Sequence, residues 1–150
     1  MHEVSEIVAE LKSSYAAEIE VIVNYLAQAT NLEGPRAEPI KEWLDEEVQT
    51  ALGHARRLAR RINVLEGKVP TSRELSRVQK ASCPVAADAN HVLLDAIKAA
   101  DATITRYERI IELCDGRDFV TLDLIIELLV DERERKQRLI AFLTNDKEHQ

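Results

Sequence analysis

Apolar residues recur along this chain at intervals of three and four, the spacing that places side chains on one face of an α-helix. Over the first thirty residues they occupy positions 4, 7, 8, 11, 15, 19, 22, 25, 26 and 29. Three later stretches show the same spacing, and breaks that contain most of the glycine and proline separate the stretches. The pattern predicts four long helices, at about 3–30, 36–66, 84–114 and 118–144.

The lengths of the links between these stretches predict how the helices are arranged. The first and third links are short, so each joins two helices into an antiparallel hairpin. The middle link, Gly67–Pro84, is polar and long enough to run the length of a bundle. Within it, Thr71 and Glu74 have capping-box spacing, which predicts a short helix at roughly 72–80. The predicted fold is an all-α, up-down-down-up four-helix bundle with a long crossover between its second and third helices.

The composition agrees with one globular domain over residues 1–150 and argues against several function classes. Hydrophobic residues make up 45% of the chain and charged residues 31%. The net charge is −7 and basic residues alternate with acidic ones, so no nucleic-acid partner is expected. No segment is apolar enough for a signal core or a membrane span, so no membrane partner is expected. Cys83 and Cys114 lie far apart without a CxxC motif, which is typical of reduced thiols in a cytoplasmic protein.

Polar residues interrupt the apolar stripes near the middle of the predicted helices. Glu18 does so in the first helix, Glu47 and His54 share one face of the second, and Glu132 lies in the fourth, one turn before Arg135. Each alone is also typical of a partly solvated bundle edge or of a hydrogen-bonded core histidine. Several buried carboxylates together need compensation, because burial penalises their charge. A metal ion is one solution, since carboxylate and imidazole bind iron, manganese and zinc, and a buried arginine is the other.

Three stretches of the sequence resemble bacterioferritin and the wider ferritin-like family. The most specific is 54–67, which begins with His and ends in Leu-Glu-Gly, and the other two are 18–25 and 118–132. The resemblance covers nearly the whole chain at low similarity and implies the same ferritin-like bundle. The family builds a di-iron site from a Glu on each of two helices and a Glu-x-x-His motif on each of the others. The resemblance implies that Glu18, His54 and Glu132 correspond to three of these ligands.

The sequence departs from the family pattern at the remaining ligand positions. Ala51 stands where the first Glu-x-x-His motif has its Glu, and Arg135 stands where the second has its His. The third-helix Glu falls near 99–101, where Ala100 is the preferred equivalent and Asp101 is a shorter neighbour. The resemblance therefore implies a degenerate site rather than a pair of bridged irons.

Two functions follow from these residues. In the first, Glu18, His54 and Glu132, joined by Glu47, bind one iron, manganese or zinc ion, with weak ferroxidase or iron-handling activity. In the alternative, the protein is a metal-free, non-enzymatic scaffold for assembly or partner binding, whose core is a salt-bridge network of Glu, His and Arg135.

The resemblance also bears on haem and on assembly. The family's haem-ligating Met corresponds to Leu52 and the only methionine is Met1, so no haem is expected. The chain ends soon after the fourth helix, without the fifth helix that helps many ferritins to close a cage. We expect a homo-oligomer, at least a dimer. Ile19, Val23 and Trp43 either form a dimer face or widen the core stripe.

Overall fold

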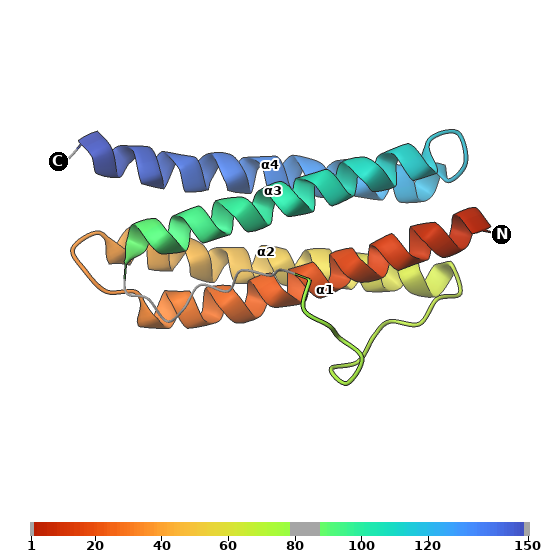
Figure 1. The fold of residues 1–150 in the computed structure, drawn as a ribbon, viewed down its shortest axis with the longest axis horizontal. Coiled ribbons are helices and arrows are strands. Elements are labelled where there is room, and N and C mark those ends of the chain that lie inside the picture. The colour runs from red at the N-terminus through yellow and green to blue at the C-terminus, as the bar shows by residue number, and fades with distance from the viewer. Residues whose placement is uncertain (1, 79–87, 149–150) are drawn as a thin grey trace.

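The computed structural model describes residues 2–78 and 88–148, and across them the chain forms four long helices (Figure 1). α1 and α4 run in one direction and α2 and α3 in the other, so the up-down-down-up prediction is confirmed. α1 packs against α2 and α3, and α4 packs against α3 and α2. None of these helices has the length and apolar character that crossing a bilayer requires. Their bounds are α1 His2–Asn31, α2 Ala37–Val64, α3 Ala89–Cys114 and α4 Phe119–Glu148.

The third helix begins later than the sequence predicts. Asp88 is extended, with φ −89° and ψ 117°, and its carboxylate accepts a hydrogen bond of 3.0 Å from the backbone N–H of Asn90. This is the geometry of an N-cap aspartate, and it starts α3 at Ala89. The predicted start near residue 84 is therefore wrong, and Pro84 itself lies outside the described residues.

The second helix ends two residues earlier than predicted, at Val64. Glu66 follows it in the left-handed region, with φ 64°, and the N–H of Gly67 donates to the carbonyl of Ile62 at 2.9 Å. A Cβ atom at Gly67 would lie 2.7 Å from Val8 Cγ1. Glycine at this position therefore allows α1 to approach the end of α2 closely.

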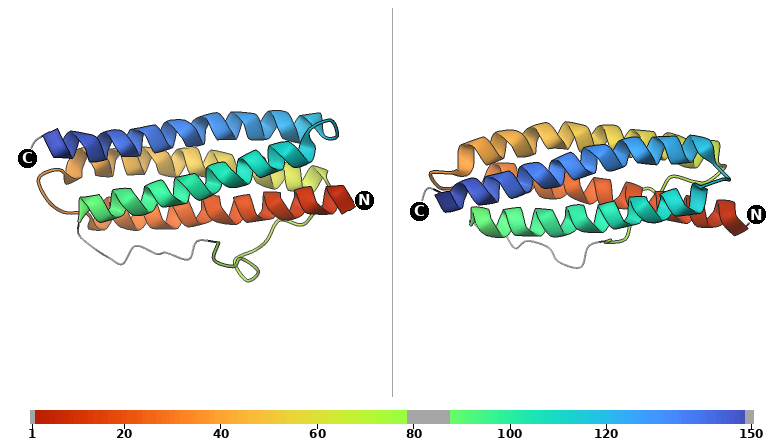
Figure 2. Two further views of the ribbon diagram at one scale, coloured as in Figure 1. Left: turned by 45° about the horizontal axis from the view of Figure 1, so that its top comes forward. Right: turned by 90° about the horizontal axis from the view of Figure 1, so that it is seen from above.

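The described part of the crossover, 67–78, lies beside α1 (Figure 2). The backbone N–H of Thr71 donates to the Glu74 carboxylate at 2.8 Å, as the capping-box spacing predicts. Only a single turn over 72–74 follows, so the predicted short helix does not form over 72–78, and 79 and 80 lie outside the described residues. Helix nucleation is costly, and this segment has no apolar stripe to bury in return. The backbone N–H of Val78 instead donates to Glu20 on α1.

Two apolar clusters fill the bundle. The Leu44 cluster occupies the half where α1 ends and α2 begins, and it includes Tyr25 and Leu139. Trp43 packs on its edge, with ring centroids 6.2 Å from Tyr25 and 5.7 Å from Phe142, so it belongs with the core stripe. The Leu58 cluster fills the other half and is made of Ile7, Leu11, Leu58, Ile62, Tyr107, Ile110, Cys114, Ile125, Leu128 and Leu129.

A polar layer separates the two clusters. Its members are Glu18, His54, Glu132 and Arg135, all of them buried. Elsewhere Cys114 is a free, buried thiol, as predicted, and Cys83 lies outside the described residues.

Candidate metal centre

Three ligand-type side chains from three helices meet in the polar layer. Glu18 comes from α1, His54 from α2 and Glu132 from α4, with relative exposures of 1%, 3% and 1%. One ligand atom of each lies within 4.8 Å of the others. Among the side chains that the structure describes, this is the only group of three His, Cys, Asp or Glu close enough to share a metal ion. The structure thus brings together three of the four residues that the sequence predicts as ligands.

The neighbouring apolar residues hold these side chains inward. On α1, Glu18 lies two turns from Leu11 and two turns from Tyr25, and on α4 Glu132 lies two turns from Ile125 and from Leu139. All four of these apolar side chains are buried in the two clusters. Because residues two turns apart share a helix face, burial of the clusters fixes the direction of the carboxylates between them.

The imidazole of His54 is held by two carboxylates. Its Nε2 lies 2.9 Å from Asp131 Oδ2, and its Nδ1 lies 3.5 Å from Glu18 Oε1. Burial lowers the pKa of His54, but Glu18 and Asp131 together raise that pKa above its usual value. When His54 is neutral with its proton on Nε2, which then donates to Asp131, the lone pair of Nδ1 faces the centre of the layer. Sequence reasoning gave Asp131 no role, although its place directly before Glu132 puts it on the neighbouring face of the same helix.

The guanidinium of Arg135 lies among the carboxylates. Its Nη1 donates to both oxygens of Glu132, at 2.9 and 3.2 Å, and lies 4.0 Å from Glu18 Oε2. Burial lowers the pKa of Arg135, but the surrounding carboxylates raise that pKa well above its usual value, so the side chain stays charged. Burial raises the pKa of Glu132 to about 7, against the opposing effect of Arg135. The pairing of Arg135 with Glu132 and Glu18 agrees with the second interpretation of the sequence.

Two tyrosines complete the polar layer, and sequence reasoning assigned them no chemical role. The hydroxyl of Tyr107 donates to Glu18 Oε1 at 3.0 Å. The ring centroid of Tyr25 lies 5.9 Å from Cζ of Arg135, within reach of a cation–π interaction. Burial raises the pKa of both phenols, so both remain protonated at neutral pH. Their aromatic rings made them indistinguishable from core residues in the sequence.

Glu47 takes a different place from the one predicted. Its side chain is 15% exposed, and its Oε2 lies 3.7 Å from Nη2 of Arg135. It is outside the group of ligand atoms formed by Glu18, His54 and Glu132. Glu47 therefore faces the arginine, and this arrangement adds negative charge to the layer.

The alanines at the missing ligand positions are buried where the sequence places them. Ala51 is fully buried and Ala100 is 2% exposed, and both belong to the Leu44 cluster. The Asp101 side chain is 52% exposed and pairs with Lys136 at 2.6 Å, so it points away from the polar layer. Ala100, the preferred equivalent of the family's third-helix Glu, therefore faces the core, and Asp101 does not.

The residues present fit one metal ion but do not fit a pair. Ala51 and Ala100 offer no donor, and a guanidinium stands at the position of the second histidine. Glu18 Oε2 lies 4.0 Å from Arg135, beyond hydrogen-bond distance, and both it and His54 Nδ1 are buried with no hydrogen-bond partner. Buried polar atoms are rarely left without a hydrogen bond, and with His54 neutral and protonated on Nε2 both atoms have lone pairs that a divalent cation would satisfy.

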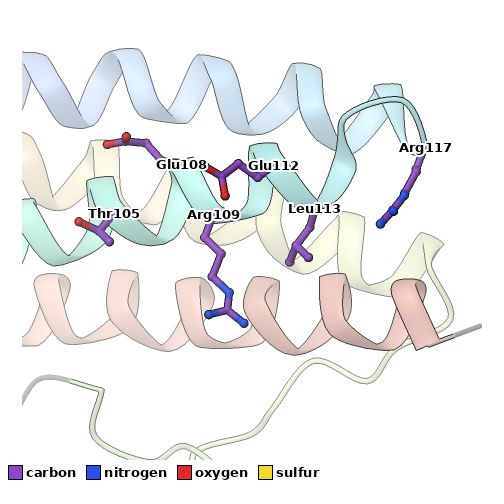
Figure 3. Close-up of a pocket in the computed structure, with 6 residues that line it drawn as sticks. All are labelled: Thr105, Glu108, Arg109, Glu112, Leu113 and Arg117. Carbon is purple, nitrogen blue, oxygen red and sulfur yellow. The ribbon is translucent and has the colours of Figure 1, made fainter.

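A hollow on the protein surface lies apart from the polar layer and is lined mainly by charged side chains (Figure 3). It lies at the C-terminal half of α3, where Arg109 pairs with Glu10 at 3.2 Å and Arg117 pairs with Glu3 at 3.4 Å. None of the polar-layer residues line this hollow, and their burial encloses the candidate centre within the bundle. Its lining residues are Thr105, Glu108, Arg109, Glu112, Leu113 and Arg117.

Comparison with solved structures finds the same bundle in several bacterial proteins. A ferritin-like, diiron-carboxylate protein from Bacillus anthracis is 25% identical, with a TM-score of 0.83 over 95% of this chain and 99% of that one. A dodecameric thioferritin, the bacterioferritin-related protein of Bacteroides fragilis, is 24% identical, with a TM-score of 0.91 over 97% and 89%. The bacterioferritin of Desulfovibrio desulfuricans is 21% identical, with a TM-score of 0.79 over 98% and 83%.

Two comparisons at the level of sequence gave different results. Among curated protein sequences none matches this chain significantly. The model of the family described as "Ferritin-like domain" matches residues 8–148, which is most of the chain. Together with the four-helix bundle, this match establishes that the chain belongs to the ferritin-like domain family.

Proposed function

We propose that this protein binds one divalent cation, iron(II) or manganese(II), between Glu18, His54 and Glu132. The observation that carries the proposal is the pair of buried polar atoms, Glu18 Oε2 and His54 Nδ1, which have no hydrogen-bond partner. Two carboxylates and one imidazole suit iron and manganese, whereas a site for softer metals would contain thiolates. Family membership supports the proposal, since a structural neighbour at 25% identity is described as a diiron-carboxylate protein.

The chain's own residues would prepare this centre for a metal. Asp131 orients His54 through Nε2, and the hydroxyl of Tyr107 holds one oxygen of Glu18 while the other oxygen has no hydrogen-bond partner. The two apolar clusters exclude bulk water on either side. An iron ion bound here would supply one-electron exchange between its ferrous and ferric states, so weak ferroxidase or iron-handling activity is the function we assign.

Metal loading tests the proposal directly. Wild-type protein is incubated with Fe(II) without oxygen or with Mn(II), passed through a desalting column, and measured by elemental analysis. We expect about one ion per chain in wild type and almost none in Glu18→Ala/His54→Ala, which loses two of the three ligands. Wild type without metal, or equal metal in both proteins, contradicts the proposal. The control is Glu38→Ala/His91→Ala, which removes an exposed glutamate and an exposed histidine and should bind as wild type does.

A second candidate function is a metal-free scaffold whose centre is a salt-bridge network. The observation that favours it is the pair of hydrogen bonds from Arg135 Nη1 to both oxygens of Glu132. In this case wild type keeps no metal after loading, and Arg135 is needed for stability alone. The loading experiment therefore separates the two functions.

We further propose that the protein works as a homo-oligomer, at least a dimer. The Bacteroides fragilis neighbour is described as dodecameric, and α1 exposes Val23 and Leu26 at 60% and 49%. Exposed apolar side chains on a neighbouring pair of turns are typical of a protein interface. Light scattering coupled to gel filtration would measure the mass of the assembly.

A further inference from the structure

We infer that Arg135 takes the place of a second metal ion and limits this centre to one divalent cation. The inference rests on the proposed function, because it concerns the stoichiometry and affinity of the same site. It is drawn from the position of the guanidinium, from the charge of the side chains around it, and from the way in which Glu132 is shared.

The guanidinium contacts carboxylates from three helices, as a bound cation would. Nη1 reaches both oxygens of Glu132 on α4 and lies 4.0 Å from Glu18 on α1, and Nη2 lies 3.7 Å from Glu47 on α2. Arg135 is only 2% exposed, so water screens these interactions weakly. Ala51 and Ala100, at the two other ligand positions, are small buried side chains of the Leu44 cluster and offer no donor to a second ion.

The charge of the layer matches one divalent ion when Arg135 is included. Glu18, Glu47 and Glu132 carry three negative charges when deprotonated, as metal binding requires, and Arg135 returns one positive charge. The remaining two negative charges neutralise one dication. A second dication would leave an excess of two positive charges in a buried layer, which is strongly unfavourable. Asp131 does not alter this count, because its side chain is 45% exposed and solvated.

Arg135 does not prevent the first ion from binding to Glu132. A carboxylate offers about four lone-pair sites on its two oxygens, so it can accept Arg135 and bind a cation together. Glu18 Oε2 and His54 Nδ1 are the other two donors, and neither is used by a hydrogen bond. Arg135 therefore lowers the affinity for the first ion by repulsion and excludes the second.

A titration with Co(II) measures both effects without redox chemistry, by calorimetry and by the visible absorption of the bound ion. Wild type should bind one Co(II) per chain. Arg135→Gln removes the charge, and we expect its dissociation constant to fall at least about tenfold. Arg135→Lys keeps a charge and should stay within about threefold of wild type, and the control Arg133→Gln, on the exposed face of α4, within about twofold. An unchanged affinity in a folded Arg135→Gln protein overturns the inference.

Stoichiometry provides a second test that does not depend on the stability of Arg135→Gln. Ala51→Glu restores the first Glu-x-x-His motif but keeps Arg135, and it should still bind one Co(II) per chain. Ala51→Glu/Arg135→His restores both motifs and should bind two. Two ions in Ala51→Glu, or two in wild type, overturn the inference even if the double variant does not fold. One ion in a folded double variant overturns it as well.

The two proposals fail in different ways. If wild type binds no Co(II), Fe(II) or Mn(II), the proposed function fails, and Arg135 is then the only cation of the layer. If wild type binds one ion but Arg135→Gln and Ala51→Glu behave contrary to expectation, the proposed function stands and the role of Arg135 is wrong.

Discussion

The polar layer and the Leu58 cluster beside it are buried to the same extent, but burial acts on them in opposite directions. Removing a leucine such as Leu58 from water stabilises the fold by roughly 1.5–3 kcal/mol. Removing Glu18, Glu132 and Arg135 from water costs free energy that their mutual attraction only partly offsets. The layer also leaves Glu18 Oε2 and His54 Nδ1 without hydrogen-bond partners, whereas the cluster consists almost entirely of apolar side chains. Stability alone therefore does not explain why this chain keeps charged groups at its centre.

The largest expected effect comes from removing the cation of the layer. Arg135→Ala in the metal-free protein leaves Glu132 and Glu18 buried beside each other without a counter-charge, and should lower the free energy of unfolding by about 3–5 kcal/mol. Leu58→Ala in the apolar cluster should cost a similar amount, about 2–5 kcal/mol, through the cavity that it leaves. Urea denaturation measures both. A loss below about 0.5 kcal/mol for Arg135→Ala, typical of an exposed residue, would contradict the expectation.

Urea denaturation of a variant that lacks both charges of the Glu132–Arg135 pair tests the contrast between the polar layer and the Leu58 cluster further. Glu132→Leu/Arg135→Met replaces the ion pair by apolar side chains, and should be neutral or stabilising by about 1–4 kcal/mol. This variant should also lose metal binding, because Glu132 is a proposed ligand. A double variant as unstable as Arg135→Ala would show that the pair contributes to stability by itself, and the contrast between layer and cluster would then disappear.

The pH dependence of stability gives a smaller effect. The pKa of Glu132 is raised to about 7 in the folded, metal-free protein, and that of His54 is raised above its usual value. Both groups therefore hold protons in the fold that the unfolded chain has already released. Their stabilising contribution is complete below the unfolded pKa of Glu132 and is lost as the pH rises through the folded pKa values. Between about pH 5 and 8 the free energy of unfolding should fall by about 2–3 kcal/mol.

Removing the titrating carboxyl tests this assignment. Glu132→Gln should lose most of the pH dependence, while Glu127→Gln, which changes an exposed glutamate on the same helix, should retain it. The apolar cluster has no group that titrates in this range, so Leu58→Ala should lower stability by the same amount at each pH. A stability that rises from pH 5 to 8 would reverse the predicted sign.

How much the sequence could predict differs between these regions for a physical reason. Helical periodicity is a property of the local sequence, so it predicted all four helices and the inward direction of Glu18, His54 and Glu132. In the crossover, the capping-box spacing correctly predicted the contact between Thr71 and Glu74, but the predicted helix does not form over 72–78. A cap satisfies one end of a helix and does not supply the burial that stabilises the helix. Contacts between helices are not encoded in spacing, so Asp131 and the direction of Glu47 were found only in the structure.

The smallest effect concerns Tyr107, which belongs to both regions. Its ring packs in the Leu58 cluster, and its hydroxyl donates to Glu18 Oε1 at 3.0 Å. Tyr107→Phe keeps the ring and removes one hydrogen bond to a charged group, so it should lower the free energy of unfolding by about 1.5 kcal/mol. Because the hydroxyl orients a proposed ligand, the affinity for Co(II) should fall by about 10-fold or more.

The two readouts of Tyr107→Phe separate its two roles. Tyr15→Phe, a change to the half-buried tyrosine on α1 that packs against the same cluster, is the control and should change neither quantity appreciably. Lost stability with unchanged Co(II) affinity would place Tyr107 in the apolar cluster alone. Lost affinity in a protein of nearly wild-type stability would mean that its hydroxyl serves the metal centre, and that the polar layer extends to α3, which contributes none of its charged members.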